Sequence, residues 1–110
     1  MKECKFEYDG ESNSLIVYRE DRRSYNSIDF GEIIVDLDKN MNLSAVEILN
    51  PDLLYGIPKK ELLKISRASI KIQHRGQLFW IFVILRFQGV KAEKQLQIPI
   101  PLALERPIYI

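Results

Sequence analysis

The stretch LFWIFVILRF, residues 78–87, is strongly hydrophobic and contains a single charged residue, Arg86. It is too short for a membrane-spanning helix, which needs about 20 apolar residues, and its aromatic and β-branched content favours a strand. Alternate side chains of a strand point to opposite faces. Both sets are apolar here: one comprises Leu78, Trp80, Phe82 and Ile84, and the other Phe79, Ile81, Val83, Leu85 and Phe87. The run therefore predicts an interior strand that is covered on both faces, partly by a neighbouring molecule.

Alternating residues and turn residues around this run predict a mainly β protein (α+β by strict count) with antiparallel sheets in the order ββββ-α-βββ. The predicted strands cover residues 5–8, 14–19, 27–38, 43–49, 67–75, 78–87 and 92–102, and a short helix covers residues 59–65 after a helical turn at 51–55. Because the connections are short, neighbouring strands should be antiparallel and the first four should form a meander of two hairpins. Pro99 and Pro101 place the end of the last strand at a sheet edge, since proline lacks the N–H that a ladder needs.

Length and charge limit the classes of protein to consider. The chain has 110 residues, which predicts one domain. Lys and Arg number 16 against 15 Asp and Glu, so a general basic excess for nucleic acid or anionic membranes is absent. The single cysteine, Cys4, excludes an internal disulfide framework and is typical of a reducing compartment. The opening residues, MKECKFEYDG, lack the apolar core of a signal peptide, so a cytoplasmic location is expected.

Several different short motifs lie in the first half of the chain. They are Tyr8-Asp9, Glu11, Leu15, Val17, Ile34-Val35-Asp36, Asp38 and the run AVEIL at 45–49. Through these residues the segment 3–65 resembles a small prokaryotic family known as domain of unknown function 2283. The resemblance implies an antiparallel fold and brings no catalytic residue or cofactor to transfer. Gly10 departs from the family, which often has proline there, and residues 66–110 form a three-strand extension that typical short members lack.

Acidic residues gather near the predicted hairpins. They are Asp9, Glu11, Asp29, Glu32, Asp36, Asp38 and Glu47. Asp36 and Asp38 share a strand face about 7 Å apart, and with Glu47 they are candidates for a hard-cation site or an acid–base pair. The alternative is a solvated sheet face followed by a turn, and whether the three carboxyl groups converge is open at this point. No Asp-x-Asp-x-Asp-Gly loop supports a metal site, so no metal ligand is predicted.

Candidates for other chemistry are sparse. His74 is the single histidine, which excludes a multi-histidine zinc site, and Cys4 adds one further ligand at most. The chain has no Gly-x-Ser-x-Gly nucleophile elbow and no glycine-rich phosphate loop. The sequence therefore predicts no catalytic residue and no cofactor, and it favours a protein that is not an enzyme.

Basic residues run through the predicted helix and the strand that follows. They are Lys59, Lys60, Lys64, Arg67, Lys71 and Arg75. Such a stripe is able to contact phosphates, which makes weak nucleic-acid binding one alternative function. The aromatic residues that would stack on bases lie in the run 78–87, which is predicted to be core. A solvated face is therefore the preferred interpretation, and nucleic acid is not expected as the main partner.

The preferred hypothesis is a small protein-interaction module that associates with itself. The second half offers more apolar surface than one short helix and a hairpin pair can cover, and exposed apolar surface usually marks an interface. A homodimer is predicted to use the C-terminal edge, where unpaired backbone groups favour addition of a strand from a second copy. The candidate interface residues are Ile98, Ile100, Leu102, Ile108, Tyr109 and Ile110. An antitoxin-like regulatory subunit that masks a basic partner with its acidic hairpins is an alternative, and no membrane partner is predicted.

Overall fold

The computed structural model describes residues 2–75, 78–90 and 92–101 of the chain. These residues form eight antiparallel strands and two short helices, which confirms the mainly β prediction. The strands are β1 (Lys2–Asp9), β2 (Ser14–Tyr18), β3 (Asn26–Asp29), β4 (Ile33–Leu37), β5 (Leu43–Leu49), β6 (Ile65–Arg75), β7 (Leu78–Phe87) and β8 (Glu93–Pro101), and the helices are α1 (Pro51–Tyr55) and α2 (Lys59–Leu62). The strand order in the sheet is β3-β4-β5-β2-β1-β6-β7-β8.

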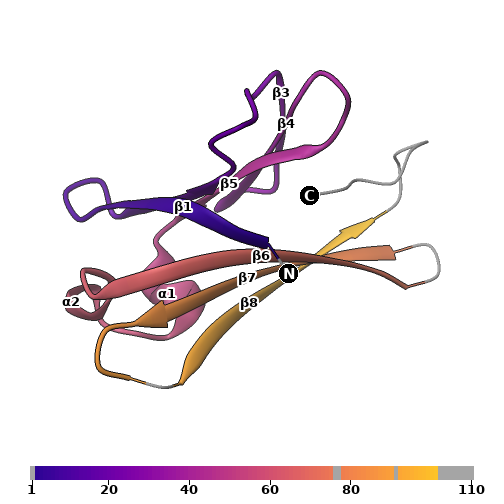
Figure 1. Cartoon of the computed structure of the whole chain (residues 1–110). Coiled ribbons are helices and arrows are strands. Elements are labelled where there is room, and N and C mark those ends of the chain that lie inside the picture. The colour runs from indigo at the N-terminus through magenta and orange to yellow at the C-terminus, as the bar shows by residue number, and fades with distance from the viewer. Residues whose placement is uncertain (1, 76–77, 91, 102–110) are drawn as a thin grey trace.

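Strand β1 belongs to both halves of the sheet. Its first residues, Lys2 to Cys4, pair with Ile70 to Ala68 of β6, and the stretch Lys5–Asp9 pairs with β2. Because β1 changes partner along its length, the sheet folds over on itself. Figure 1 shows the result as two layers, β1 to β5 above and β6 to β8 below, with both helices at one end.

The space between the layers is the hydrophobic core. One face of β7 supplies Phe79, Ile81, Val83, Leu85 and Phe87, all of them buried, as the alternation predicted. The facing layer contributes Leu15, Val17, Val35, Val46 and Ile48. Helix α1 closes the end of this space, where the buried Tyr55 hydroxyl donates a 3.0 Å hydrogen bond to the Val83 carbonyl oxygen. The two helices thus act as an end cap on a two-layer β core.

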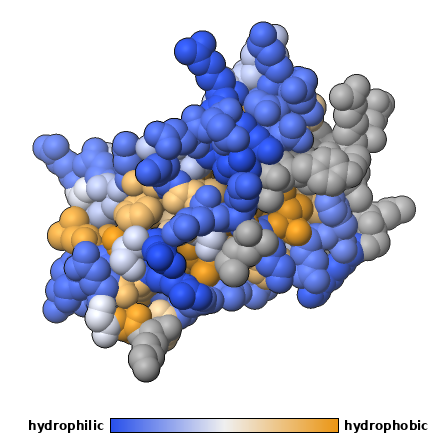
Figure 2. Space-filling view, in the orientation of Figure 1, coloured by the Kyte–Doolittle hydropathy of each residue, from blue (hydrophilic) through white to orange (hydrophobic). Residues whose placement is uncertain are grey.

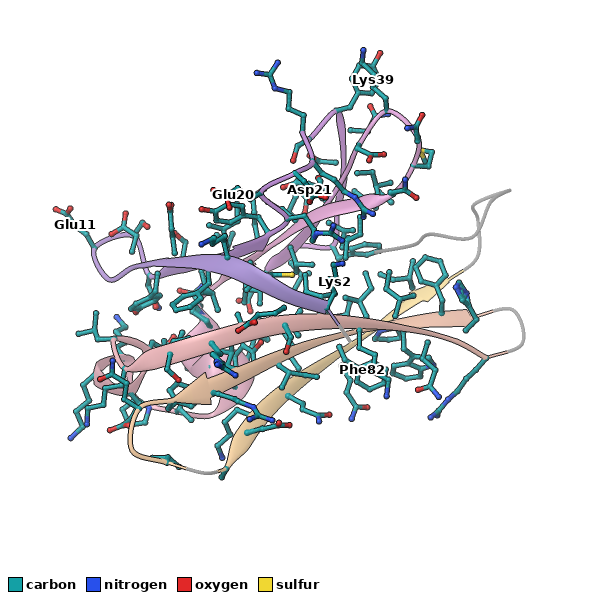
Figure 3. The ribbon with its side chains drawn as sticks, viewed as in Figure 1. Lys2, Glu11, Glu20, Asp21, Lys39 and Phe82 are labelled. Atoms are coloured by element: carbon teal, nitrogen blue, oxygen red, sulfur yellow. The ribbon has the colours of Figure 1, made fainter. Side chains whose placement is uncertain are left out.

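The second face of β7 differs from the prediction of a covering layer. Phe82 and Ile84 are buried but lie outside the core cluster, and Phe82 points away from β1 to β5 (Figure 3). None of the described elements lies beyond this face in Figure 1. Side chains of the neighbouring strands provide the cover instead, as when the Lys71 ammonium lies 5.2 Å from the centre of the Phe82 ring. The segment around Trp80 is therefore a two-faced strand with a core on one side only.

Both predicted hairpins of the first half form, β1 with β2 and β4 with β5, but they do not join as a meander. Strand β2 pairs with β5 rather than with the strand that follows it, and the four-residue β3 lies at the outer edge. The predicted strand 27–38 is in fact two strands, because Gly31 takes a φ of 86° and its N–H bonds Asp29 Oδ1 at 2.7 Å, which closes a tight turn. The pairing of β2 with β5 places Val17 beside Val46, so both face the core.

A polar cluster joins the first hairpin to α1. Asn13 and Asn50 both have a φ of 51°, the left-handed region that Asn tolerates. The Asn13 amide nitrogen donates to Asp52 Oδ1 at 2.9 Å and its amide oxygen accepts from the Tyr8 hydroxyl at 2.8 Å. The Asn50 N–H bonds the Asn13 carbonyl oxygen at 3.0 Å, directly before Pro51 begins the helix. This cluster sets where α1 starts, and Gly56 (φ 68°) ends it, in agreement with the helical turn predicted at residues 51–55.

The last strand lies at an edge, as its two prolines predict. Strand β8 pairs with β7 and ends the sheet order. Pro99 stands opposite Trp80, and its nitrogen must turn away from β7 for the pairing to continue. The outward edge of β8 consequently loses donors at Pro99 and Pro101, which weakens strand addition there.

The different surroundings of adjacent side chains in β7 give a test of this architecture. Replacing Ile81, which is fully buried, with Ala should lower the free energy of unfolding by ~2–5 kcal/mol, because a core cavity results. Replacing Trp80, which is half-buried on the other face, with Ala should lower the free energy of unfolding by clearly less, although Trp has the larger side chain. Urea denaturation measures both values, and equal or reversed losses would contradict the assignment of the core to one face.

Candidate functional site

Two of the three candidate carboxyl groups meet. Asp36 of β4 stands opposite Ala45 of β5, and Glu47 lies two residues further along β5 on the same face, away from Val46. The Glu47 carboxyl hydrogen-bonds the Asp36 carboxyl, and the Ser27 hydroxyl of β3 donates to Asp36 Oδ1 at 2.6 Å. Asp36 is buried and Glu47 is half-buried. The three strands of the outer unit therefore carry one carboxyl pair held by a serine.

The pair is arranged to share one proton. The hydrogen bond to Asp36, burial, and repulsion by the Asp36 charge raise the pKa of Glu47 to about 7. Glu47 in its neutral form can therefore donate to the Asp36 carboxyl, which also accepts from the Ser27 hydroxyl. Such a pair can bind a proton near neutral pH, and it explains how two carboxyl groups lie adjacent within a folded sheet.

The third carboxyl group, Asp38, does not join the pair. Asp38 Oδ1 accepts the N–H groups of Asn40 and Asn42 at 2.8 and 2.9 Å, so it closes the turn before β5. Asp9 does the same for the first hairpin by accepting from Glu11 N–H at 2.9 Å. Within the described ranges, no group of three potential ligands could hold a metal ion. The acidic residues named from sequence are therefore one pair, Asp36 with Glu47, three turn-closing aspartates, Asp9, Asp29 and Asp38, and two exposed glutamates, Glu11 and Glu32.

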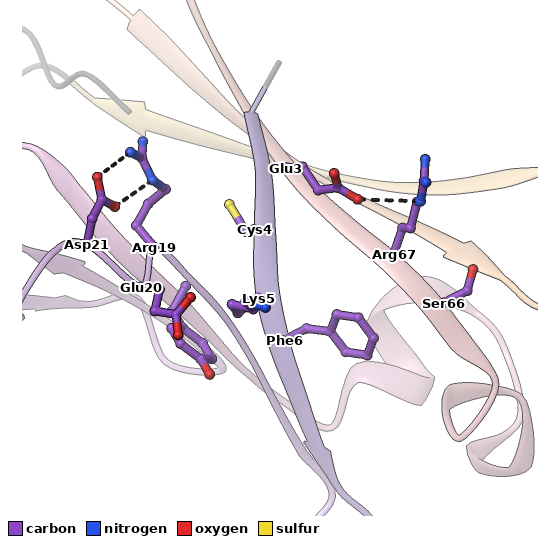
Figure 4. Close-up of a pocket in the computed structure, with 10 residues that line it drawn as sticks. Glu3, Cys4, Lys5, Phe6, Arg19, Glu20, Asp21, Ser66 and Arg67 are labelled. Carbon is purple, nitrogen blue, oxygen red and sulfur yellow. Dashed lines mark hydrogen bonds and ion pairs between the residues drawn. The ribbon is translucent and has the colours of Figure 1, made fainter.

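Cys4 lies in an open groove of about 640 Å³ beside the point where β1 changes partner (Figure 4). Across the groove, the Arg19 guanidinium makes two hydrogen bonds to Asp21 at 3.0 and 2.7 Å, and on the other side of β1 the Glu3 carboxylate is 3.4 Å from Arg67. Burial raises the pKa of the Cys4 thiol above its ordinary value, which opposes formation of the nucleophilic thiolate. The groove thus contains internally paired charges around a protonated thiol.

His74 is exposed near the end of β6 and its ring lies 5.8 Å from that of Phe79. The two residues stand opposite each other in the β6–β7 ladder. Cys4 lies at the other end of the paired part of β6, opposite Ala68. The structure therefore does not bring the single histidine and the single cysteine together.

The basic stripe divides into two parts. Lys59, Lys60 and Lys64 belong to the helical end, where Lys64 pairs with Glu61 at 3.5 Å. Lys71 and Arg75 lie on β6, on the same face as Trp80 and Phe82 of β7. The prediction that the aromatic residues of the run are core is thus correct for Phe79 and Phe87, which belong to the core between the layers. Phe82 is buried but outside that cluster, and Trp80 is only half-buried, because both alternating sets are apolar and only one faces β1 to β5.

We call this outward surface of β6, β7 and β8 the basic-aromatic face. Its members are Ser69, Lys71, Gln73 and Arg75 of β6, Trp80, Phe82 and Ile84 of β7, and Gln95, Gln97 and Pro99 of β8. The register places Lys71, Phe82 and Gln97 in one row across the strands, and Gln73, Trp80 and Pro99 in the next. Lys71, Arg75 and Gln73 therefore flank the central aromatic strand on the β6 side, and Gln95 and Gln97 flank it on the β8 side.

The predicted interface residues are placed only in part. Ile98 and Ile100 are buried in the core of this chain, facing β7 residues Ile81 and Phe79 in the ladder. Leu102, Ile108, Tyr109 and Ile110 lie outside the described residues. The exposed side of the last strand is instead formed by Gln95, Gln97 and Pro99.

An exposed apolar surface occurs at the helical end, which sequence reasoning missed. A groove of about 110 Å³ is lined by Ile57, Glu61, Phe87, Val90, Ala92 and Lys94, and we call it the end groove. Val90, in the turn after β7, is 52% exposed, and Ala92 is also exposed. Figure 2 shows hydrophobic residues at this end of the molecule, where α2 and the β7–β8 turn lie. The only sequence signal is an apolar valine in a turn that begins with Gln88-Gly89.

Comparison with known proteins finds two archaeal relatives of part of the chain. An uncharacterised protein of Methanocaldococcus jannaschii is 38% identical over 60 residues, covering 54% of this chain and 52% of the relative. A putative hypoxanthine phosphoribosyltransferase of Methanosarcina mazei is 29% identical over 69 residues, covering 63% and 56%. The matches thus span about half the length of these relatives. No family model and no solved structure matches the chain, so the resemblance to domain of unknown function 2283 stays a prediction.

No helix within the described part of the chain is long and apolar enough to cross a membrane.

The carboxyl pair predicts a pH dependence of stability. A pKa of about 7 in the folded state exceeds the ordinary glutamate value of 4.5, so the folded protein keeps a proton that the unfolded chain releases. The free energy of unfolding should therefore fall as the pH rises from about 5 through 7. Glu47→Gln should flatten this fall and raise the free energy of unfolding at pH 8 by about 1 kcal/mol. Glu32→Gln, at an exposed turn, is the matched control. An unchanged slope in Glu47→Gln, measured by denaturation from pH 5 to 8, would contradict the shared proton.

Proposed function

We propose that the protein is a small interaction module, without a catalytic role of its own, that forms a homodimer through the end groove. The single observation behind this proposal is the exposed apolar lining of the groove, to which α2, the β7–β8 turn and the start of β8 contribute. Val90 and Ala92 are exposed next to Ile57 and Phe87 in one apolar lining, and contiguous exposed apolar surface of this kind favours an interface. The last strand keeps a part in the interface, through its first residues rather than its C-terminal end.

A second copy of the chain suits this groove because the rim carries one charge of each sign. Glu61 lies on the α2 side and Lys94 on the β8 side. In a two-fold dimer each copy presents the same patch, so Glu61 of one copy can face Lys94 of the other. The net charge of the chain is only +1, which leaves little repulsion between copies. We place the dimer in the cytoplasm, in line with the single free thiol.

The oligomeric state tests this proposal directly. The full chain should show about twice its 12.9 kDa mass by light scattering at micromolar concentration. Val90→Asp should convert it to a monomer, because the substitution buries a carboxylate in an apolar contact. Tyr25→Asp, at another strongly exposed hydrophobic position, should leave the dimer intact. A monomeric unmodified chain, or a dimer insensitive to Val90→Asp, would refute the proposal.

A charge exchange tests the two-fold arrangement. Glu61→Lys and Lys94→Glu should each weaken the dimer, since each places like charges across the interface. The double variant should restore association, because the pairing is recovered with its signs reversed. Failure of the double variant to recover, while both single variants remain folded by circular dichroism, would exclude this geometry.

A further inference from the structure

The two halves of the chain carry opposite charge. Residues 1–50 hold six Lys or Arg and eleven Asp or Glu, and residues 51–110 hold ten and four. Among the described residues, the layer of β1 to β5 is therefore strongly acidic, and the layer of β6 to β8 with its helices is basic, with eight Lys or Arg against three Asp or Glu. This separation of charge orients the molecule in the field of an anionic partner so that its basic layer faces the partner.

The basic-aromatic face has cations that are free of carboxylate partners. Two carboxylates lie next to one end of this face, Glu3 of β1 and Glu93 of β8, and each is bound to an arginine, Arg67 and Arg86 respectively. Among the described residues, no carboxylate pairs with Lys71 or Arg75: Lys71 lies over the Phe82 ring and Arg75 bonds Gln73 Oε1 at 3.2 Å. Both cations are exposed. They are consequently available to an anionic ligand along about 13 Å of β6, at the usual rise per residue.

Between these cations and the amides of β8 lies the aromatic strand. Trp80 and Phe82 are two residues apart on one face, and the Trp80 side chain is half-exposed. Aromatic side chains on an open sheet face are a platform on which unpaired bases stack. Gln73, Gln95 and Gln97 offer donors and acceptors to base edges on both sides of that platform. An acidic protein would satisfy the cations but would give no role to Trp80.

We propose that the basic-aromatic face binds single-stranded nucleic acid, with Lys71 and Arg75 contacting phosphates and Trp80 stacking on a base. Phe82 is buried beneath Lys71 and forms the apolar base of the site beside Trp80. The flat sheet face has no protruding element among the described residues to enter a duplex groove, so paired strands bind less well. This inference is independent of the proposed dimer, because the end groove uses different residues.

Trp80 is the single tryptophan, so its fluorescence reports on the site without a label. Titration with an oligothymidylate or oligouridylate of about 12 nucleotides should quench it in a saturable way. For variants, anisotropy of a fluorescein-labelled oligonucleotide replaces the intrinsic signal. Trp80→Ala should weaken binding about tenfold or more. Lys71→Gln and Arg75→Gln should each weaken it and lower the slope of log affinity against log salt by about 0.7.

The controls separate this site from charge alone. Lys39→Gln, in a turn of the acidic layer, removes the same charge and should leave affinity unchanged, as should Tyr25→Ala, which removes an exposed aromatic residue elsewhere. Circular dichroism checks that each variant is folded. If Trp80→Ala does not fold, the variants at the exposed Lys71 and Arg75 test the proposal instead. The proposal would be overturned if the oligonucleotide did not quench Trp80, or if duplex bound as tightly as the single strand. It would also be overturned if heparin bound as tightly as the oligonucleotide and Trp80→Ala left heparin binding unchanged. The heparin result would show a surface for any polyanion.

Discussion

The divided pairing of β1 is the constraint on which the rest of the structure depends. Three residues at one end of this strand pair with β6 and the next five pair with β2, so a single strand must serve two sheets that diverge. The divergence creates the space that the hydrophobic core fills and the open groove beside Cys4. It also decides which face of every other strand is inward, because each layer can bury only the side that faces its partner.

The two faces of β7 follow from that arrangement. The side turned toward β1 to β5 is fully packed, whereas Trp80, Phe82 and Ile84 are turned outward and rely on side chains of β6 and β8 for cover. A long lysine stem can shield a ring while its ammonium group stays in water, as Lys71 does over Phe82. The outer face thus combines a buried apolar base with a polar and cationic surface. This combination suits a ligand with flat rings and negative charge better than it suits a second copy of the same basic layer.

Local patterns predict the elements well but the pairing between them poorly. Alternation identified β5 and β-forming composition identified β7 with their observed bounds, and the helical turn expected at residues 51–55 is α1, because these signals depend on a few adjacent residues. The pairing of β2 with β5 depends on contacts distant in sequence, and Asp36 meets Glu47 only because of the β4–β5 register. The outward position of Trp80 was beyond sequence reasoning for a different reason. When both alternating sets are apolar, periodicity shows that two faces exist but not which one is buried. The end groove gave no periodic signal at all.

The partner exchange of β1 also affects how the chain folds during synthesis. Residues Lys5–Asp9 can pair with β2 as soon as the next few residues are synthesised. Lys2 to Cys4 can pair with β6 only after β6 has left the ribosome. In the nascent chain this end of β1 is an open strand edge, the kind of segment that captures similar strands of other chains. Lys2 and Glu3 lie within this segment and Lys5 follows it directly, and charged residues at such an edge oppose its pairing with other chains. Their replacement by apolar residues should therefore reduce the yield of native protein in cells more than it reduces the stability of the finished fold.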